Sequence, residues 1–370
     1  MAIEKITIVE LLQLVHRYPV LDVRSPGEYT KANIPGAWSL PLFSDEERKI
    51  TGTAYKQESK EAAVKIGLAF FGKKMVQLLE EAEKIIAQHT PPGPAAATGK
   101  EKTVIVHCWR GGMRSAGVAW LLDLYGFKVY TLQGGYKSFR RWCVLQFTRK
   151  YPFKIIGGYT GSGKTGMLNV LKEKGHNVID LEALAHHKGS VFGHLGEAAQ
   201  PTQEMFENGL ALALSETAPG KDTWLEDESM RIGKVTIPVT LFNQLQKSPV
   251  YFFEIPFDQR LNCIVESYGR FEKEQLTESI LKLKKRLGGL ATKTALLFLE
   301  AGDRPGCFSI LLRYYDKYYL KSLAQKNGQA PFVQKITAPG TEAVANVELL
   351  LQQQESNVPE KIMHDGFNNR

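Results

Sequence analysis

One short segment constrains this fold more than any other: a glycine-rich turn between an apolar strand and a helix. Residues 158–165 read GYTGSGKT and fit the pattern G-x-x-x-x-G-K-[ST] without a mismatch. They follow the apolar run 153–157 and precede a segment with helical spacing, 166–175. In such a turn the backbone N–H groups converge on an anion at the helix N-terminus, where the helix dipole also favours negative charge. The sequence therefore predicts a phosphate-binding loop rather than an ordinary glycine-rich turn.

The predicted diphosphate-binding residues all belong to this loop. They are Gly158, Thr160, Gly161, Ser162, Gly163, Lys164 and Thr165. We expect Lys164 to reach the terminal phosphates, and Thr165 to offer its hydroxyl group to Mg²⁺ if the ion accompanies them. No tightly bound cofactor is expected.

Acidic residues near the ends of neighbouring strands are the expected partners of the phosphate loop. The strand candidate 223–226 ends in Glu226, and Asp227 and Glu228 follow it directly. Asp180 ends the strand candidate that follows the phosphate-loop helix, where kinase-like folds often place a residue that faces the substrate. With Arg231, these residues form the predicted acids and bases of the cleft. The alternative for the run 226–228 is a solvated acidic turn.

Three histidines, His186, His187 and His194, lie close together in the sequence. Their spacing fits no zinc-binding pattern and no cysteine lies near them, so no metal site is predicted there. We expect these side chains to line the cleft or to cap loops.

A second glycine-rich turn carries a cysteine. Residues 107–115 read HCWRGGMRS, and they end an apolar strand, 103–107, and precede a helix. A cysteine in this position lies among converging N–H groups, which lower the pKa of its thiol. We therefore predict Cys108, Arg110 and Arg114 as catalytic residues, rather than a buried structural thiol. The rest of the predicted anion-binding loop consists of Trp109, Gly111, Gly112, Met113 and Ser115.

Two chemistries use a cysteine loop of this kind. Cysteine phosphatases form a phosphocysteine on a C-x5-R loop, whereas rhodaneses carry sulfur or selenium on the thiolate as a persulfide-type intermediate. The upstream segment 21–42, LDVRSPGEYTKANIPGAWSLPL, resembles the rhodanese signature and favours the second chemistry. Single-domain sulfurtransferases usually have C-x4-R, so the longer loop here predicts a wider cradle, suited to an anion of phosphate size or larger.

The chain of 370 residues is long enough for two domains with separate cores. Strand candidates alternate with helices, which predicts the α/β class with parallel sheets. The strand candidates are 19–24, 103–107, 128–132, 153–157, 178–180, 223–226, 250–255 and 332–336. We predict a rhodanese-like domain over 1–148 and a P-loop NTPase-like domain over 149–258. A mostly helical part, 259–356, is expected to pack on the P-loop domain, followed by a disordered tail, 357–370.

Composition bears on where the protein acts. The four cysteines, Cys108, Cys143, Cys263 and Cys307, are widely separated, which favours a reducing cytosol over a disulfide framework. No run of 18 apolar residues is present, and the N-terminus lacks the features of a secretory signal. A cytoplasmic monomer that does not contact membranes is expected.

The net charge of +8 is concentrated in the first part of the chain. Residues 1–150 hold 22 Lys and Arg against 14 Asp and Glu, whereas residues 151–370 hold 25 of each. A basic cluster between 137 and 150 includes Lys137, Arg140 and Arg141, and a second one is Lys284, Lys285 and Arg286. Such clusters are either solvated basic surface or a binding surface for a polyanion.

Taken together, the motifs make the chain resemble the tRNA 2-selenouridine synthases over about residues 8 to 320. Six blocks carry this resemblance: CWRGGMRS at 108–115, LQGGYKSFRR at 132–141, GYTGSGKT at 158–165, DLEALAHHKGSVFG at 180–193, LEDESMRIG at 225–233 and RYYDKYY at 313–319. One departure is Lys188, where arginine is expected in that block.

The resemblance implies an enzyme that acts on the wobble uridine, position 34, of tRNAs for Lys, Glu and Gln. Geranyl diphosphate would first alkylate the sulfur of 2-thiouridine, and selenophosphate would then supply selenium as the S-geranyl group leaves. The phosphate loop suits the diphosphate leaving group, and Cys108 suits the selenium step. The two basic clusters become candidate contacts for tRNA phosphates. Wobble bases lie in a single-stranded loop, where they can stack on aromatic side chains.

Three alternatives remain open from the sequence. The first is a P-loop kinase or NTPase fused to a sulfurtransferase that acts on small molecules. The second is a binding protein in which a regulatory rhodanese module accompanies an RNA-binding ATPase. The third is a cysteine phosphatase.

Overall fold

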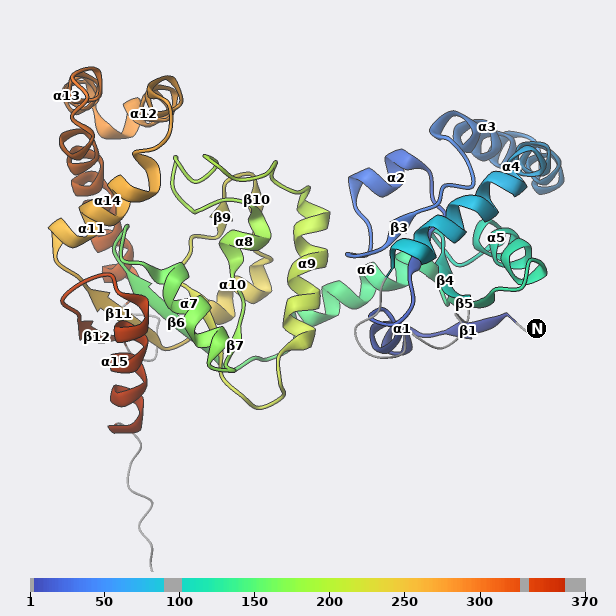
Figure 1. The fold of residues 1–370 in the computed structure, drawn as a ribbon, viewed down its shortest axis with the longest axis horizontal. Coiled ribbons are helices and arrows are strands. Elements are labelled where there is room, and N and C mark those ends of the chain that lie inside the picture. The colour runs from blue at the N-terminus through green and yellow to red at the C-terminus, as the bar shows by residue number, and fades with distance from the viewer. Residues whose placement is uncertain (1–2, 90–101, 327–332, 357–370) are drawn as a thin grey trace, which may run out of the picture. The chain divides into compact units, whose positions relative to one another are not determined.

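The computed structural model describes residues 3–89, 102–326 and 333–356, which form two compact units (Figure 1). The first unit comprises Met1–Arg149 together with Pro201–Ser215, and the second comprises Lys150–Gln200 and Glu216–Arg370. The predicted tail, 357–370, lies outside the described residues. No helix among the described residues is long and apolar enough to cross a membrane.

The first unit is built on a five-stranded sheet in which every pairing is parallel. The strand order is β1-β5-β4-β2-β3. The strands are β1 (Glu4–Ile6), β2 (Val20–Asp22), β3 (Trp38–Ser39), β4 (Thr103–His107) and β5 (Lys128–Leu132). The central strand β4 is buried along its whole length. That burial explains the apolar residues 104–106 at its centre, because parallel strands are covered on both faces.

Seven helices of the described chain belong to this unit. They are α1 (Ile8–Leu14), α2 (Pro26–Lys31), α3 (Asp45–Gln57), α4 (Lys60–Gln88), α5 (Met113–Leu124), α6 (Gly135–Gln146) and α9 (Gln203–Glu216). Figure 1 shows α3 and α4 side by side. Helix α3 begins with a capping box formed by Ser44 and Glu47, which satisfies N–H groups at its first turn. The core between α4, α5 and the sheet contains Phe71, Leu122 and Phe127.

Helix α9 departs from the predicted domain boundaries. The prediction placed residues 149–258 in one domain, but Pro201–Ser215 pack within the first unit. Asn208 on α9 is fully buried, and its side-chain amide donates to Asn33 O at 2.7 Å and to the Tyr136 hydroxyl at 2.9 Å. Its oxygen accepts from the Arg140 guanidinium. Helical spacing shows which face of α9 is apolar, but it does not show which core that face joins.

The second unit also contains a five-stranded parallel sheet. The strand order is β12-β11-β6-β8-β7. The strands are β6 (Phe153–Gly158), β7 (Asn177–Val178), β8 (Thr223–Glu226), β11 (Val250–Glu254) and β12 (Val333–Thr337). The phosphate-loop strand β6 is therefore central, with β8 and β11 on either side. A short antiparallel pair, β9 (Arg231–Ile232) and β10 (Val235–Thr236), follows β8.

The helices of the second unit form two groups. Helices α7 (Lys164–Glu173), α8 (Leu181–Ala185), α10 (Val239–Leu245) and α15 (Ala343–Ser356) accompany the sheet, and α15 packs on α7. Helices α11 (Phe257–Tyr268), α12 (Lys273–Leu287), α13 (Gly289–Glu300) and α14 (Arg304–Lys326) form a helical part with a core of its own. The predicted helical part, 259–356, therefore also contains strand β12, which completes the sheet.

We predict that Asn208→Ala lowers the free energy of unfolding of the first unit by about 2–4 kcal/mol, because buried partners lose their hydrogen bonds. Chemical denaturation followed by fluorescence measures this change. The exposed Gln203 on the same helix provides the control, and Gln203→Ala should change stability by less than about 0.5 kcal/mol. Equal effects of the two substitutions would contradict a structural contribution of α9 to this unit.

Candidate active sites

The cysteine loop lies between the central strand β4 and helix α5, at the carboxyl edge of the first sheet. Cys108 is 3% exposed, and its Sγ lies 3.2 Å from the Ser115 hydroxyl oxygen. The backbone N–H groups of Arg110, Gly112 and Ser115 are hydrogen-bonded to the thiol sulfur. The loop residues 109–113 are exposed, so the sulfur lies at the base of a turn that is open to solvent.

The surroundings of Cys108 stabilise the thiolate. Burial raises the pKa of the thiol, but hydrogen bonds from the Ser115 hydroxyl and from the loop N–H groups outweigh it and bring the pKa below its ordinary value. Cys143 shows the effect of burial without such a loop, since burial raises the pKa of its thiol to about 12. The loop therefore prepares Cys108 as a nucleophile.

The turn after β5 fixes the shape of the cysteine loop. The N–H of Tyr136 donates to Cys108 O at 2.8 Å, and the N–H of Lys137 donates to Trp109 O at 2.9 Å. Gly135 has a φ of +58°, and a Cβ atom there would lie 2.3 Å from Cys108 O. Only glycine allows this close approach, which explains the Gly-Gly pair in the block 132–141.

The two predicted arginines of the loop differ in their surroundings. Arg114 is half-buried, and its guanidinium donates to the Glu28 carboxylate at 2.7 Å. Burial raises the pKa of Glu28, but hydrogen bonds and charge from Arg114 more than offset this and hold the pKa below its usual range. Arg110 is exposed at the rim of the loop. Glu28 therefore orients Arg114, whereas Arg110 faces solvent.

A cavity of about 240 Å³ adjoins the loop. It is lined by four cationic and two acidic side chains and by one aromatic ring: Arg24, Lys31, Arg48, Arg114, Glu28, Glu204 and Trp109. Glu204 comes from α9, so a residue distant in the sequence contributes to the wall. The excess of cationic side chains makes the cavity suitable for an anion.

A buried polar network supports the loop from beneath. Arg24 and Asp22 form an ion pair with almost no exposure, and the Arg24 guanidinium lies 3.9 Å from the centre of the Tyr136 ring. The Tyr136 hydroxyl donates to Glu204 at 2.8 Å. Burial lowers the pKa of His107, despite Asp22 nearby, which favours its neutral form. The sequence motif contained Asp22 and Arg24, but it did not indicate their link to α9.

We predict that Ser115→Ala raises the pKa of the Cys108 thiol, because the hydroxyl group is the strongest contribution that lowers it. The pH dependence of ultraviolet thiolate absorbance, taken as a difference from Cys108→Ala, measures this pKa. The thiolate should form at higher pH in Ser115→Ala than in the wild type, whereas Cys143→Ala should leave the profile unchanged. An identical profile for Ser115→Ala would contradict the proposed effect of the hydroxyl group.

The phosphate loop connects β6 to α7 as predicted from its sequence. Gly161 and Gly163 have φ values of +81° and +72°, a conformation that favours glycine. Lys164 donates from its Nζ to Gly158 O at 3.1 Å, across the loop. Ser162 is almost fully buried, and its hydroxyl oxygen has no hydrogen-bond partner within the described residues. The geometry is that of a preformed turn whose lysine lies over the space for an anion.

Residues far along the chain hold this loop in place. Arg260 is 4% exposed and donates to Thr160 O at 3.2 Å and to both carboxylate oxygens of Asp316. The Tyr319 hydroxyl donates to the Asp227 carboxylate and accepts from the N–H of Gly158. These contacts come from α11 and α14. Their function was not predictable from the sequence, although the block 313–319 contains both Asp316 and Tyr319.

The predicted cleft acids form a cluster next to the loop. Thr165 donates to a Glu182 carboxylate oxygen at 3.3 Å, and the N–H of Glu182 donates to Glu226 at 3.0 Å. Burial, together with the charges of Asp180 and Glu182, raises the pKa of Glu226 to about 8. Burial, together with the charges of Glu182 and Glu226, raises the pKa of Glu228 well above its usual range, and Glu228 shares a hydrogen bond with Glu182. The cluster therefore holds fewer negative charges than its composition suggests.

The other predicted residues of this region lie outside the cluster. Asp180 caps the N-terminus of α8 by accepting from the N–H of Ala183 at 2.7 Å. Arg231 is exposed and donates to Gly233 O at 3.0 Å, within the β9–β10 turn. Glu182 was not among the predicted site residues, although it links Thr165 to the acids.

Two places in the second unit bear on metal binding. His186 ends α8, with its ring 3.0 Å from Ala199 O, and the His194 ring lies 3.1 Å from Val191 O. These two histidines cap loops. Across the described parts of the chain, no three His, Cys, Asp or Glu side chains are arranged to hold a metal ion. The Thr165 and Glu182 oxygens are the ones that would face Mg²⁺, and binding of Mg²⁺ stays a prediction.

We predict that Glu226→Gln stabilises the second unit at high pH. The folded state raises the pKa of Glu226 from 4.5 to about 8, so its stability contribution is complete below pH 4.5 and is lost as pH rises through 8. The variant keeps the acceptor for Glu182 but cannot ionise. Thermal unfolding across this range should show an advantage of the variant that grows up to pH 8. The exposed Glu173→Gln is the control, and an advantage that does not depend on pH would contradict the prediction.

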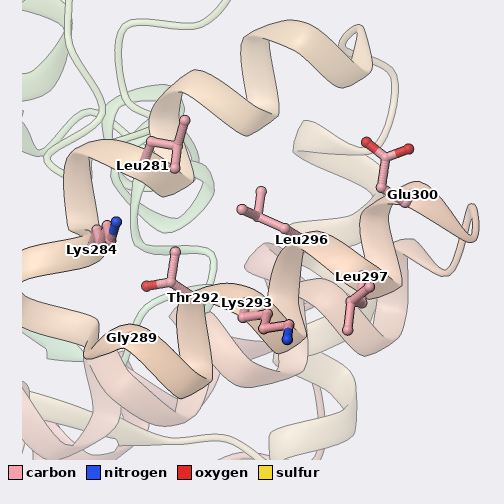
Figure 2. Close-up of a pocket in the computed structure, with 8 residues that line it drawn as sticks. All are labelled: Leu281, Lys284, Gly289, Thr292, Lys293, Leu296, Leu297 and Glu300. Carbon is pink, nitrogen blue, oxygen red and sulfur yellow. The ribbon is translucent and has the colours of Figure 1, made fainter.

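The predicted tRNA-binding residues lie at two places in the structure. Lys137 and Arg141 are exposed on α6, but Arg140 is half-buried and is paired with Glu207 and Asn208. Lys284, Lys285 and Arg286 are exposed in the last turn of α12. A cavity of about 280 Å³ lies between α12 and α13. Figure 2 shows the residues that line it: Leu281, Lys284, Gly289, Thr292, Lys293, Leu296, Leu297 and Glu300. Because Arg140 is paired with residues of α9, its side chain stabilises the packing of the first unit.

The folds and sites define a class of protein: a rhodanese-like cysteine domain joined to a P-loop domain. A family model described as "Rhodanese-like domain" matches residues 7–141, and one described as "tRNA 2-selenouridine synthase AAA domain" matches residues 151–346. These matches confirm the predicted α/β fold class and favour the rhodanese over the phosphatase family.

Curated relatives cover most of the chain. A tRNA 2-selenouridine synthase from Bdellovibrio bacteriovorus is 34% identical over 84% of this chain and 90% of its own length. Proteins of the same name from Pseudomonas entomophila and Shewanella piezotolerans are 33% and 32% identical, each over 85% of this chain and 90% and 91% of their own lengths. The chain belongs to the tRNA 2-selenouridine synthase family, as its motifs predicted.

Proposed function

We propose that this protein is a cytoplasmic, monomeric transferase that converts 2-thiouridine to 2-selenouridine at the wobble position of tRNAs for Lys, Glu and Gln. The observation that carries the proposal is the thiol of Cys108, stabilised as a thiolate beside a cationic cavity, in a chain that also has a phosphate loop. The names of the relatives support the same reaction.

The first step is assigned to the second unit. The sulfur of 2-thiouridine forms a bond to C1 of geranyl diphosphate, and the C1–O bond breaks with its electron pair going to the diphosphate. The developing charge lies where Lys164 and the backbone N–H groups of the loop can stabilise it. Protonated Glu226 and Glu228 reduce the repulsion that ionised carboxylates would exert on a bound diphosphate.

The second step is assigned to the cysteine loop. Selenium from selenophosphate becomes bonded to C2 of the modified uridine, and the geranyl group leaves with the sulfur as a thiol. The selenophosphate anion suits the cavity that Trp109 and Arg114 of the cysteine loop line, where Arg114 is oriented by Glu28. The exposed basic residues Lys137, Arg141 and Lys284–Arg286 are proposed contacts for tRNA phosphates.

The experiment supplies 2-thiouridine tRNA with geranyl diphosphate, alone or together with selenophosphate, and identifies the nucleosides by mass spectrometry. Lys164→Ala should slow geranylation by about 10²-fold or more, because the leaving group loses its main cation. Cys108→Ala should permit geranylation and abolish selenium entry. Two controls should retain both steps: Lys172→Ala, an exposed lysine on the same helix, and Cys143→Ala.

Wild-type protein that leaves 2-thiouridine unchanged in every mixture would refute this proposal. ATP turnover without tRNA would then favour the P-loop kinase or NTPase fused to a sulfurtransferase. Retention of both steps in Cys108→Ala would instead show that the cysteine domain is not catalytic.

A further inference from the structure

We infer that Cys108 attacks the phosphorus atom of selenophosphate rather than its selenium atom, so that the cysteine loop passes through a phosphocysteine and releases selenide in the cavity. The inference rests on the proposed function for its donor, selenophosphate. It adds a phosphoryl-transfer activity to a rhodanese-like domain.

The balance of electrons favours attack on phosphorus. Selenium in selenophosphate is already at the oxidation level of selenide, and the cysteine sulfur is at the level of a thiolate. A bond between the two would require two electrons to leave, either to an oxidant or to phosphorus, which would depart as phosphite. Attack on phosphorus needs neither, because the P–Se bond breaks with its electron pair going to selenium.

The length of the cysteine loop also suits a phosphoryl group. Cys108 and Arg114 are separated by five residues, the spacing of loops that hold a phosphoryl group, and not by the four that are usual in single-domain sulfurtransferases. The extra residue enlarges the ring of backbone N–H groups around the sulfur. N–H groups of Arg110, Gly112 and Ser115 already point toward Sγ. These donors match the charge that spreads over the equatorial oxygens during phosphoryl transfer.

The Ser115 hydroxyl oxygen lies 3.2 Å from Sγ, where it can stabilise a thiolate that leaves phosphorus. It also lies 3.0 Å from Gly112 O, to which it donates when the thiol is neutral. When water hydrolyses a phosphocysteine, the sulfur leaves as a thiolate, and the same hydroxyl can turn to donate to it. A persulfide route has no such need, because its sulfur never becomes the leaving group from phosphorus.

The complete cycle balances in three steps. Thiolate and selenophosphate give phosphocysteine and hydrogen selenide anion. The selenide adds to C2 of the S-geranylated uridine, and geranyl thiolate leaves. Water then hydrolyses the phosphocysteine to inorganic phosphate and regenerates the thiol. Because hydrogen selenide anion is a weak base and a good leaving group, the first step requires no acid to protonate it.

The test uses full-length protein, selenophosphate labelled at phosphorus, and rapid quenching, first without RNA and then with an S-geranylated anticodon stem-loop. Peptide mass spectrometry locates the label, and the isotope pattern of selenium shows whether that element is also on the cysteine. Wild-type protein should carry phosphorus without selenium on Cys108, with one selenide released for each label. Cys108→Ala should carry none.

The variant Ser115→Ala tests the hydrolysis step separately. Its phosphocysteine should accumulate and turn over about 10-fold or more slowly, since its leaving thiolate lacks the hydroxyl donor. Cys143→Ala should behave as the wild type. Selenium on Cys108 without phosphorus, phosphite as a product, or no label on Cys108 even with the stem-loop present would each overturn the inference. None of these outcomes depends on the geranylation assay, so the proposed function and this inference can fail separately.

Discussion

Both sites depend on one constraint of a parallel sheet. All its strands end at the same carboxyl edge, and the turn that follows a buried central strand must direct its backbone N–H groups away from the sheet. Strand β4 delivers Cys108 in this way, and β6 delivers the phosphate loop. Each strand is central in its sheet, so its turn is flanked by the turns of two neighbours. In the first unit, the turn after β5 donates hydrogen bonds to carbonyl groups of the cysteine loop. In the second unit, the segments after the neighbouring strands supply acidic side chains beside the phosphate loop.

Local sequence determines these strands and turns, and this is why they could be predicted. Apolar runs, glycines at positive φ and helix starts act over a few residues, as in the loops around Cys108 and Lys164. The residues that hold the loops were not predictable in the same way. Arg260 and Tyr319 reach the phosphate loop from helices about a hundred residues or more further along the chain, and no periodicity indicates such a pairing.

The acids at the end of β8 and directly after it show a similar limit within a single motif. Glu226, Asp227 and Glu228 were predicted as one group, yet the structure divides them. Glu226 and Glu228 join the cluster with Glu182, whereas Asp227 is hydrogen-bonded to Tyr319. Alternate residues of an extended segment point to opposite sides, so neighbours in sequence need not share an environment. The burial that follows from this arrangement, and not the residue type, sets which carboxyl groups are ionised.

The excursion of α9 into the first unit has a consequence for how the protein is made. The chain crosses between the units after residues 149, 200 and 215, so the first unit is complete only when Pro201–Ser215 have left the ribosome. At roughly 5–20 residues per second, the cysteine domain must wait on the order of seconds for its last helix, with Tyr136 and Arg140 lacking their partner on α9. The two halves therefore do not mature one after the other along the nascent chain. Strand β6, which carries the phosphate loop, leaves the ribosome before the first unit has received α9.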